Sequence, residues 1–216
     1  MNDLEKHVLQ LIGEDENSPD VFTDDDTGLA LIRGSINDAI QELCMLTGSY
    51  TKMYPIVLQA NKQFYMIDPV SDYMGYIVDV WDRNRKKRLE AMSLNSMTMF
   101  NPRHMKENGD PAFYGYIVEK HIFISPYPLA EGIVLEAQIA MIPKPYTSDT
   151  DKIKVRVNFR NAAVYLAVSE YYASRGDANR AVDYLNRYLN VAGLMGLHPN
   201  TVEDIRQYQG FYRMRP

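Results

Sequence analysis

The residue types that carry out catalysis or bind metals are scattered along this sequence. The four histidines have no spacing that would place two of them on one metal ion; they are His7, His104, His121 and His198. We interpret each of them as a surface or strand residue. The glycines form neither a phosphate-binding loop nor a dinucleotide fingerprint, and a nucleophile elbow is absent. The sequence therefore predicts no cofactor, no metal site and no enzymatic activity.

Two other features that could carry chemistry have structural interpretations. The run Asp24-Asp25-Asp26 lacks the alternation and the distal glutamate of a calcium loop, so we interpret it as a solvated loop. Cys44 is the one cysteine of the chain, which excludes an intrachain disulfide and fits a reducing compartment. Because Cys44 lies within an apolar helical pattern, we expect a buried small hydrophobic residue.

One dense cluster of positive charge lies beyond Trp81. It consists of Arg83, Arg85, Lys86, Lys87 and Arg88. Because it follows an aromatic and β-branched segment, we expect it at the tip of a hairpin. Such a tip could contact phosphates or an acidic partner ring, or it could only keep a sheet edge soluble. Since no aromatic residues are interleaved in the run, the sequence leaves both interpretations open.

The bulk composition is that of a folded protein. The chain has 216 residues, of which 46% are hydrophobic and 24% charged, and its formal net charge is -5. This acidic balance gives no general reason to bind nucleic acid, so DNA would pass the surface without being held. Neither a signal peptide nor an apolar run long enough to cross a bilayer is visible, so we expect a soluble protein.

Helical periodicity predicts helices at both ends of the chain. A short helix covers residues 4–12, and a longer one begins at Thr27 and stops at Gly48. Residues 158–174 are apolar almost all round, which requires burial on more than one face. A second C-terminal helix begins after Asp177, a good N-cap, so the last two helices form a hairpin.

The middle of the chain has the composition of short strands separated by prolines and glycines. We expect strands at residues 63–67, 76–81, 116–124 and 133–142, and a short helix at 93–100. This spacing suggests a small antiparallel sandwich or barrel.

Together these patterns predict an α+β fold. Residues 1–50 and 151–195 would form a helical bundle from the N-terminal helix and the C-terminal hairpin. A small antiparallel β domain would be inserted at 51–150, and 196–216 would form an extended C-terminal tail. One hairpin partner cannot cover the second apolar face of the 158–174 helix. We expect a neighbouring subunit or the β domain to cover it, at a subunit interface formed by Tyr165, Val168 and Tyr172.

Six motifs in a fixed order suggest a family. They are Gln63–Pro69 (QFYMIDP), Tyr76–Trp81 (YIVDVW), Gly109–Tyr114 (GDPAFY), Ile122–Pro128 (IFISPYP), Ile139–Pro145 (IAMIPKP), and the helical pair with Asn161–Ala167 (NAAVYLA) and Arg175-Gly-Asp. In this order they resemble the adaptor, or head-to-tail connector, proteins of podovirus-type tailed bacteriophages. The resemblance spans residues 27–195 and leaves the acidic segment before it unmatched.

The resemblance implies a structural virion protein at the portal–tail junction, made in the bacterial host cytoplasm. It implies a dodecameric ring beneath the portal protein that encloses the DNA channel and contacts tail nozzle or fibre proteins. We expect the tail to dock on the portal through residue types that anchor interfaces, namely Tyr208, Phe211, Tyr212, Arg213 and Arg215. The alternative is that the tail folds back on its own bundle.

Other functions stay open on the sequence alone. Another tail subunit, such as a nozzle or tube protein, has the same structural character. A peptide-binding helical-repeat module would need at least three repeats, whereas the sequence shows one hairpin. A tail-associated hydrolase is a third alternative. The sequence does not give the copy number of the ring, its tail partner or its host.

Overall fold

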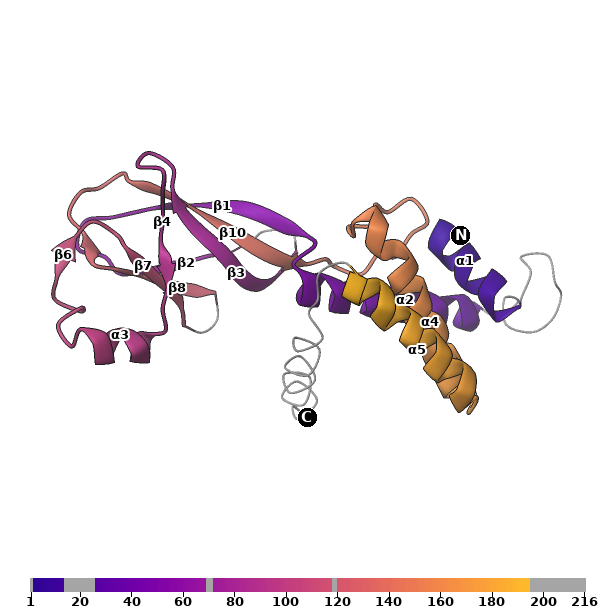
Figure 1. Cartoon of the computed structure of the whole chain (residues 1–216). Coiled ribbons are helices and arrows are strands. Elements are labelled where there is room, and N and C mark those ends of the chain that lie inside the picture. Colours follow the sequence, from indigo (N-terminus) through magenta and orange to yellow (C-terminus); the bar gives the residue numbers. More distant parts are fainter. Residues whose placement is uncertain (1, 14–25, 69–71, 118–119, 195–216) are drawn as a thin grey trace. The chain divides into compact units, whose positions relative to one another are not determined.

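The computed structural model describes residues 2–13, 26–68, 72–117 and 120–194 (Figure 1). Within these residues the fold is α+β, as expected, with five helices and sheets that are mainly antiparallel. The chain divides into two compact units. The helical unit comprises Met1–Tyr50 and Pro143–Pro216, and the β unit comprises Thr51–Ile142.

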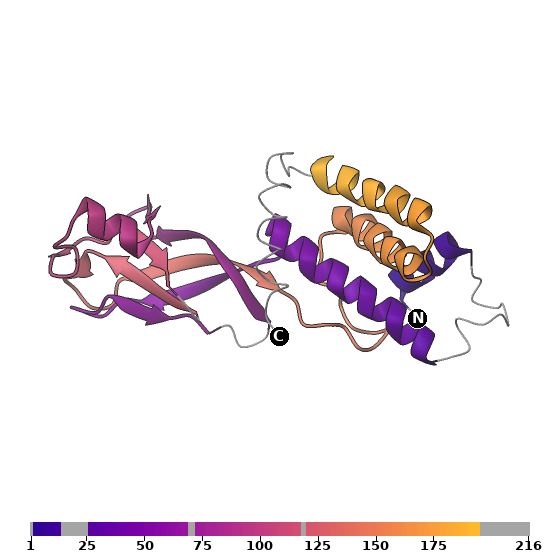
Figure 2. The same cartoon turned by 90° about the horizontal axis from the view of Figure 1, so that it is seen from below.

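The helical unit contains four of the helices. They are α1 (Asp3–Ile12), α2 (Asp26–Thr47), α4 (Val157–Ser174) and α5 (Ala178–Leu194). Helix α4 lies between α2 and α5, and α1 packs against both α4 and α2 (Figure 2). The sequence patterns placed all four helices within a residue or two of these bounds.

Local signals fix where these helices begin and end. Asn2 and Glu5 form a capping box at the start of α1, and Gly13 ends the helix in the left-handed region at φ 85°. At the start of α5, the Asp177 side chain accepts a hydrogen bond from the backbone N–H of Arg180 at 3.1 Å. The N-cap role predicted for Asp177 is therefore confirmed.

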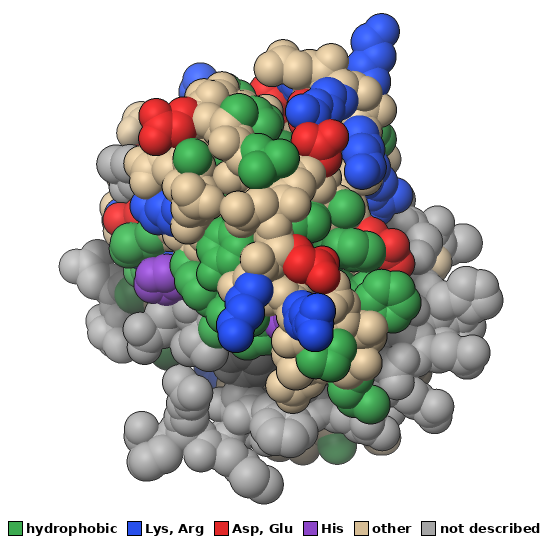
Figure 3. Space-filling view, turned by 90° about the vertical axis from the view of Figure 1, so that its left-hand side faces the viewer, with side chains coloured by type: hydrophobic (Ala, Val, Ile, Leu, Met, Phe, Trp, Pro, Cys, Tyr) green, Lys and Arg blue, Asp and Glu red, His purple; other side chains and the backbone are tan. Residues whose placement is uncertain are grey.

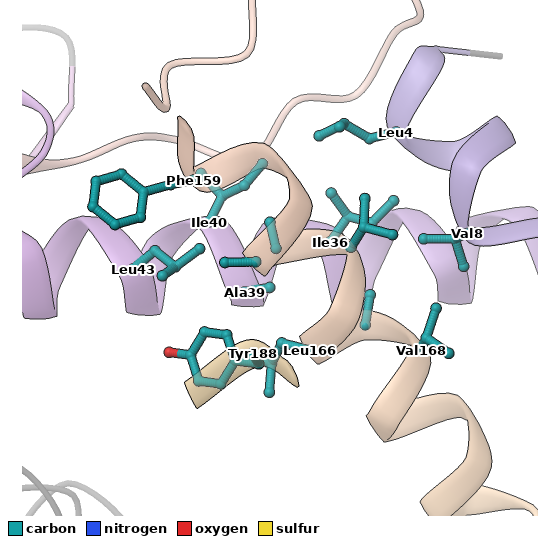
Figure 4. Packing of buried hydrophobic residues seen from close by; sticks show 14 of the residues in the cluster. Leu4, Val8, Ile36, Ala39, Ile40, Leu43, Phe159, Leu166, Val168 and Tyr188 are labelled. Atoms are coloured by element: carbon teal, nitrogen blue, oxygen red, sulfur yellow. The ribbon is translucent and has the colours of Figure 1, made fainter. Parts of the chain in front are cut away.

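One hydrophobic core joins the four helices, and α4 is at its centre (Figure 4). Leu4 and Val8 of α1 and Ile36 of α2 lie towards one end of this core, and Phe159 of α4 lies towards the other. Because three helices surround α4, it can be apolar almost all round without exposing that surface to water.

A buried polar network ties α1 to two distant parts of the chain. The Glu5 side chain is 1% exposed, and its carboxylate accepts a hydrogen bond from Arg33 Nε of α2 at 2.6 Å. The Tyr146 hydroxyl donates to the same carboxylate oxygen at 3.2 Å. Arg33 also donates to the backbone oxygen of Thr147 at 2.6 Å, so every charge in this network has a partner.

Tyr146 also corrects the domain boundary that we expected. Its backbone N–H donates to Asn37 Oδ1, and its carbonyl oxygen accepts from Asn37 Nδ2, both at 3.0 Å. These bonds hold residues 143–150 on α2. The segment therefore belongs to the helical unit, and the β unit ends at Ile142, not at residue 150.

The β unit is built from two four-stranded sheets and a small two-stranded one. The first sheet has the order β1-β10-β3-β4, with β1 (Thr51–Val57), β10 (Val134–Ile142), β3 (Tyr73–Asp82) and β4 (Lys87–Arg88). The second has the order β2-β8-β7-β5, with β2 (Phe64–Met66), β8 (His121–Ser125), β7 (Phe113–Tyr116) and β5 (Glu90–Ala91). The third pairs β6 (Asn108–Gly109) with β9 (Tyr127–Pro128), and α3 (Leu94–Phe100) lies between β5 and β6 in sequence.

The strand predictions were right where alternation or apolar composition was clear. In β10, Leu135, Ala137 and Ile139 are buried, as the alternation predicted. The expected single strand at 116–124 was wrong, because β7 ends at Tyr116 and pairs antiparallel with β8, which begins at His121. The pairings β5–β7 and β6–β9 are parallel, so the unit is not purely antiparallel.

Gly115 shows how closely the second sheet packs. A Cβ atom at this position would overlap the ring of Phe123, its cross-strand neighbour, and the backbone oxygen of Met92. Phe123 is fully buried, so its ring has no room to move aside. The glycine is therefore required for the ring of Phe123 to lie across β7.

The polar network predicts the effect of removing its cation. In Arg33→Leu the buried Glu5 carboxylate would lose the guanidinium that pairs with it, at a cost of about 2–4 kcal/mol in the free energy of unfolding. Urea unfolding followed by circular dichroism measures this difference. Arg156→Leu, at an exposed arginine of the same unit, is the control. Equal stabilities of the two variants would contradict the role given to the network.

Candidate interaction surfaces

The structure corrects the subunit interface that we expected on α4. Val168 is fully buried and Tyr172 nearly so within their own chain, and Tyr165 is half-buried. Helices α1, α2 and α5 all contact α4, so three helices of the same chain cover the face that one hairpin partner could not. Val168 and Tyr172 are therefore core residues, and no neighbouring subunit is needed to bury them.

Tyrosine rings and arginines form a surface at the edge of this core. The rings of Tyr172 and Tyr184 stack at 5.8 Å between centroids, with 16° between their planes. The Arg180 guanidinium lies over the Tyr172 ring at 5.2 Å, and that of Arg187 over the Tyr184 ring at 4.8 Å. We call these four residues, with Leu11 and Ile12, the tyrosine–arginine surface. An open hollow between α1 and the α4–α5 hairpin is lined in part by Leu11, Ile12, both tyrosines and Arg180.

A second surface follows α2 on the side away from its core stripe. Leu31, Asp38, Glu42 and Met45 recur every third, fourth or seventh residue, which places them on one face of the helix. Leu31 is 61% exposed, although it is a large apolar residue. Glu170 of α4 lies beside this face, and we call the five residues the acidic stripe. Partial burial and the charges of Asp38 and Glu42 raise the pKa of Glu170.

Sequence reasoning missed both surfaces. The core stripes of α2 and α5 identify only the buried faces of these helices. A signal was present on α2, where Leu31, Asp38 and Met45 repeat at seven-residue intervals outside the core stripe. The stacking of arginines on tyrosines had no such signal, because it depends on how α4 and α5 face each other.

The basic cluster lies on the hairpin between β3 and β4, as expected, with Trp81 paired to Arg88 and Asp82 to Lys87. Its arginines, however, are neutralised within the chain. Arg83 pairs with Glu136, Arg85 with Asp110 at 2.6 Å, and Arg88 with Asp79 at 2.7 Å. Among the described residues, no carboxylate pairs with Lys86 or Lys87. The hairpin therefore offers two free cations to a partner, not five.

An open hollow lies beside the base of this hairpin. The strand register places Pro55, Glu136 and Trp81 side by side across β1, β10 and β3, and Met53 lies on the same face. Trp81, Met53, Arg83 and Lys86 contribute to the lining of the hollow. Figure 3 looks onto one end of the β unit, where hydrophobic side chains lie among the tan surface and Lys and Arg side chains gather towards the upper edge.

Among the described residues of the β unit, helix α3 carries the two most exposed large apolar side chains. Met99 is 87% exposed and Phe100 75%, and Met105 in the following turn is also exposed. Ser93 caps the helix through its hydroxyl, which accepts from the N–H of Ser96 at 3.0 Å. Large apolar residues held this far out on an ordered element are typical of a protein contact.

The remaining predicted sites fall into two groups. The tail residues Tyr208, Phe211, Tyr212, Arg213 and Arg215 lie outside the described residues, as do His198 and the Asp24-Asp25 pair. Cys44 is fully buried, as expected, and burial raises the pKa of its thiol.

His104 differs from the expectation of a surface or strand position. It is 2% exposed, in the turn after α3, and its Nε2 lies 3.2 Å from the Thr98 hydroxyl oxygen. Within the described parts of the chain, no three histidine, cysteine or acidic side chains gather as metal ligands would. Among the same residues, no helix is both long and apolar enough to cross a bilayer.

No family model matches this sequence, and comparison with curated proteins finds no match.

The ion pairs of the hairpin predict two different outcomes for its cations. Arg88→Gln would leave the nearly buried Asp79 carboxylate without its charged partner and destabilise the β unit by about 1–2 kcal/mol. The double variant Lys86→Gln/Lys87→Gln would keep the stability of the wild type within about 0.5 kcal/mol. Urea unfolding monitored by Trp81 fluorescence distinguishes the two. A lysine variant as unstable as Arg88→Gln would contradict this division of roles.

The burial of Val168 predicts loss of the helical unit in Val168→Asp. An unpaired carboxylate at the centre of α4 would cost more than about 4 kcal/mol, a large part of the stability of a small unit. Circular dichroism would show reduced helix content and the loss of a cooperative transition. Val182→Asp, on the exposed side of α5, is the matched control and should unfold like the wild type. A folded Val168→Asp protein that failed only to associate would restore the subunit interface.

Proposed function

We propose that this chain is a structural subunit of a tailed-bacteriophage virion, an adaptor that forms a ring between the portal and the tail. The ring would enclose the DNA channel, and the protein would reside at the portal–tail junction after synthesis in the host cytoplasm. A helical bundle made from both ends of the chain, with a β domain inserted between them, is the fold that the sequence patterns predict, and it is compatible with a ring subunit. The order of the six motifs is the observation that carries this proposal.

The six motifs fall on or beside regular elements of the structure. The first two overlap β2 and β3, the third runs from the end of β6 into β7, the fourth spans most of β8 and all of β9, and the fifth covers the end of β10. The last motif covers the core of α4 and the break before α5. Each motif alone is weak, so the proposal depends on their succession in the sequence.

The surface chemistry supports a structural role in an assembly. The exposed Met99 and Phe100 are suited to a contact with a tail nozzle or fibre protein. Because in-chain carboxylates neutralise the hairpin arginines, little positive charge is left there to hold DNA by its phosphates. DNA could therefore pass such a ring without being retained.

One observation argues against the helical-repeat alternative. The α4–α5 hairpin does not stack on a second hairpin of its own kind within the described residues, because α1 and α2 pack against α4. A different tail subunit, such as a nozzle or tube protein, remains the alternative within the structural class. Binding to portal rings separates an adaptor from such a subunit.

The test is to mix the purified full chain with its portal and to image the product by electron microscopy. The proposal predicts a ring of this protein on one face of the portal. A chain that leaves the portal bare but joins a preassembled tail would instead be another tail subunit.

The C-terminal residues after Asn200 supply a second measurement. If they dock on the portal, a chain truncated there would keep the Tm of the free subunit and lose capture by portal rings. Two anchoring aromatics contribute about 2–4 kcal/mol each in a desolvated pocket, so most of the affinity should disappear. A lowered Tm would show that the segment folds back on its own bundle, and unchanged capture would exclude docking.

A further inference from the structure

Two surfaces of the helical unit have opposite chemistry and face in different directions. Glu170 belongs to the acidic stripe, and Tyr172 belongs to the tyrosine–arginine surface. On α4 these residues are two apart, so their side chains point about 200° apart around the helix axis. The helical unit therefore presents an acidic face and, separately, an aromatic face with two exposed arginines that pair with exposed aspartates.

The acidic stripe concentrates negative charge that the chain itself leaves unneutralised. Asp38 and Glu42 are one helical turn apart, and Glu170 lies close enough that their charges act on its carboxyl group. Glu42 accepts a hydrogen bond from the Tyr188 hydroxyl at 3.1 Å. Among the described residues, no lysine or arginine pairs with these three carboxylates. A cation brought by a partner would relieve their mutual repulsion.

The arginines of the other face are suited to supply that cation. Their side chains are 65% exposed for Arg180 and 51% for Arg187. Stacking on tyrosine rings orients the planar guanidinium groups, which favours bidentate binding of carboxylates. Their partners within the chain, Asp177 and Asp183, are exposed neighbours on the same helix. Such surface pairs contribute only about 0.3–0.5 kcal/mol, so a partner's carboxylates could replace them.

Apolar residues accompany the charges on both faces. Leu31 and Met45 project from the acidic stripe as exposed apolar side chains, and the tyrosine–arginine surface contains an open hollow of mixed polarity, where Leu11, Ile12 and both tyrosines lie beside Arg180 and Asp183. Arg180 and Arg187 are two helical turns apart, about 10 Å along the axis, and Asp38 and Glu42 are one turn apart, about 6 Å. The long arginine side chains can converge on these two carboxylates while the apolar groups meet beside them.

We propose that these faces bind each other between copies of this chain, with the acidic stripe of one copy packed on the tyrosine–arginine surface of the next. Because the two faces differ, each copy that has used one face still offers the other. Such a head-to-tail contact repeats from copy to copy, and it closes into a ring when the rotation between neighbours divides a full turn. The inference rests on the proposed ring function and identifies the surfaces that would build the ring.

Two one-sided variants of the full chain test the contact. Asp38→Asn/Glu42→Gln removes the charge of the acidic stripe and keeps an acceptor for the Tyr188 hydroxyl, and Arg180→Gln/Arg187→Gln removes the charge of the arginines. Each variant alone has only one working face and should stay monomeric, with the apparent Kd of self-association raised at least about a hundredfold. In an equimolar mixture, the intact arginines of one variant can bind the intact acidic stripe of the other. Neither copy then has a second intact face to bind, so the mixture should form dimers that add no further copies. Sedimentation velocity and native mass spectrometry, with and without portal rings, report these species.

Controls separate the contact from general effects of charge and folding. Asp3→Lys and Asn158→Glu change exposed residues elsewhere on the same unit and should assemble like the wild type. All variants should keep the Tm of the wild type, because the substituted side chains lie outside the core. The mixed dimer should weaken at high salt, since its contact depends on opposite charges.

Two results would overturn the inference in distinguishable ways. If the wild type forms rings and both variants do so equally well, the interface lies elsewhere and the ring function stands. If the wild type forms no ring, with or without the portal, the proposed function fails and the inference fails with it.

Discussion

The helical unit depends on a carboxylate that cannot be buried without help from distant parts of the chain. Glu5 belongs to a ten-residue helix that is too short to be stable by itself. Arg33 of α2 neutralises its charge, and Tyr146, which follows the whole β unit in sequence, donates to the same oxygen. The network therefore forms only when both ends of the chain have come together. The β unit can be inserted because β1 and β10 pair antiparallel, so the chain leaves and re-enters the helical unit through adjacent strands.

The position of α4 at the centre of the core determines which surfaces remain for partners. Because three helices surround it, almost no apolar area of α4 is left for a neighbour. Contacts with other proteins must therefore use the outer faces of α2 and α5, the parts of α1 and α4 that border them, and the exposed parts of the β unit. Those faces combine charged groups with isolated large apolar side chains, which is the usual composition of an interface between proteins that also fold alone.

The sequence predicted the elements whose signals are local. The helices carry caps and a 3.6-residue period, and the β10 alternation of Leu135, Ala137 and Ile139 identifies a half-buried strand. The turn between β7 and β8 was missed because the polar run Glu119-Lys120-His121, which divides the apolar residues of 116–124, contains no glycine, proline, asparagine or aspartate to mark a reversal. The candidate surfaces were harder to predict from the sequence than the helices and strands. Hairpin residues such as Arg88 were located correctly, but their carboxylate partners come from strands or loops whose pairing the sequence does not reveal.

The pairing of β1 with β10 also governs the order in which the chain can fold. The α2–α4 contacts close a loop of more than a hundred residues if the β unit is unfolded. Once β1 and β10 have paired, Thr51 and Ala140 are neighbours, and the loop that remains is roughly fivefold shorter. The entropy cost of closure then falls by about 1.4 kcal/mol. During synthesis, α1 and α2 would leave the ribosome before α4, and their common core would form only after α4 had followed. A β unit that had already folded would shorten the time before this core forms. The folded β unit thus brings the helices before and after it in the sequence close together.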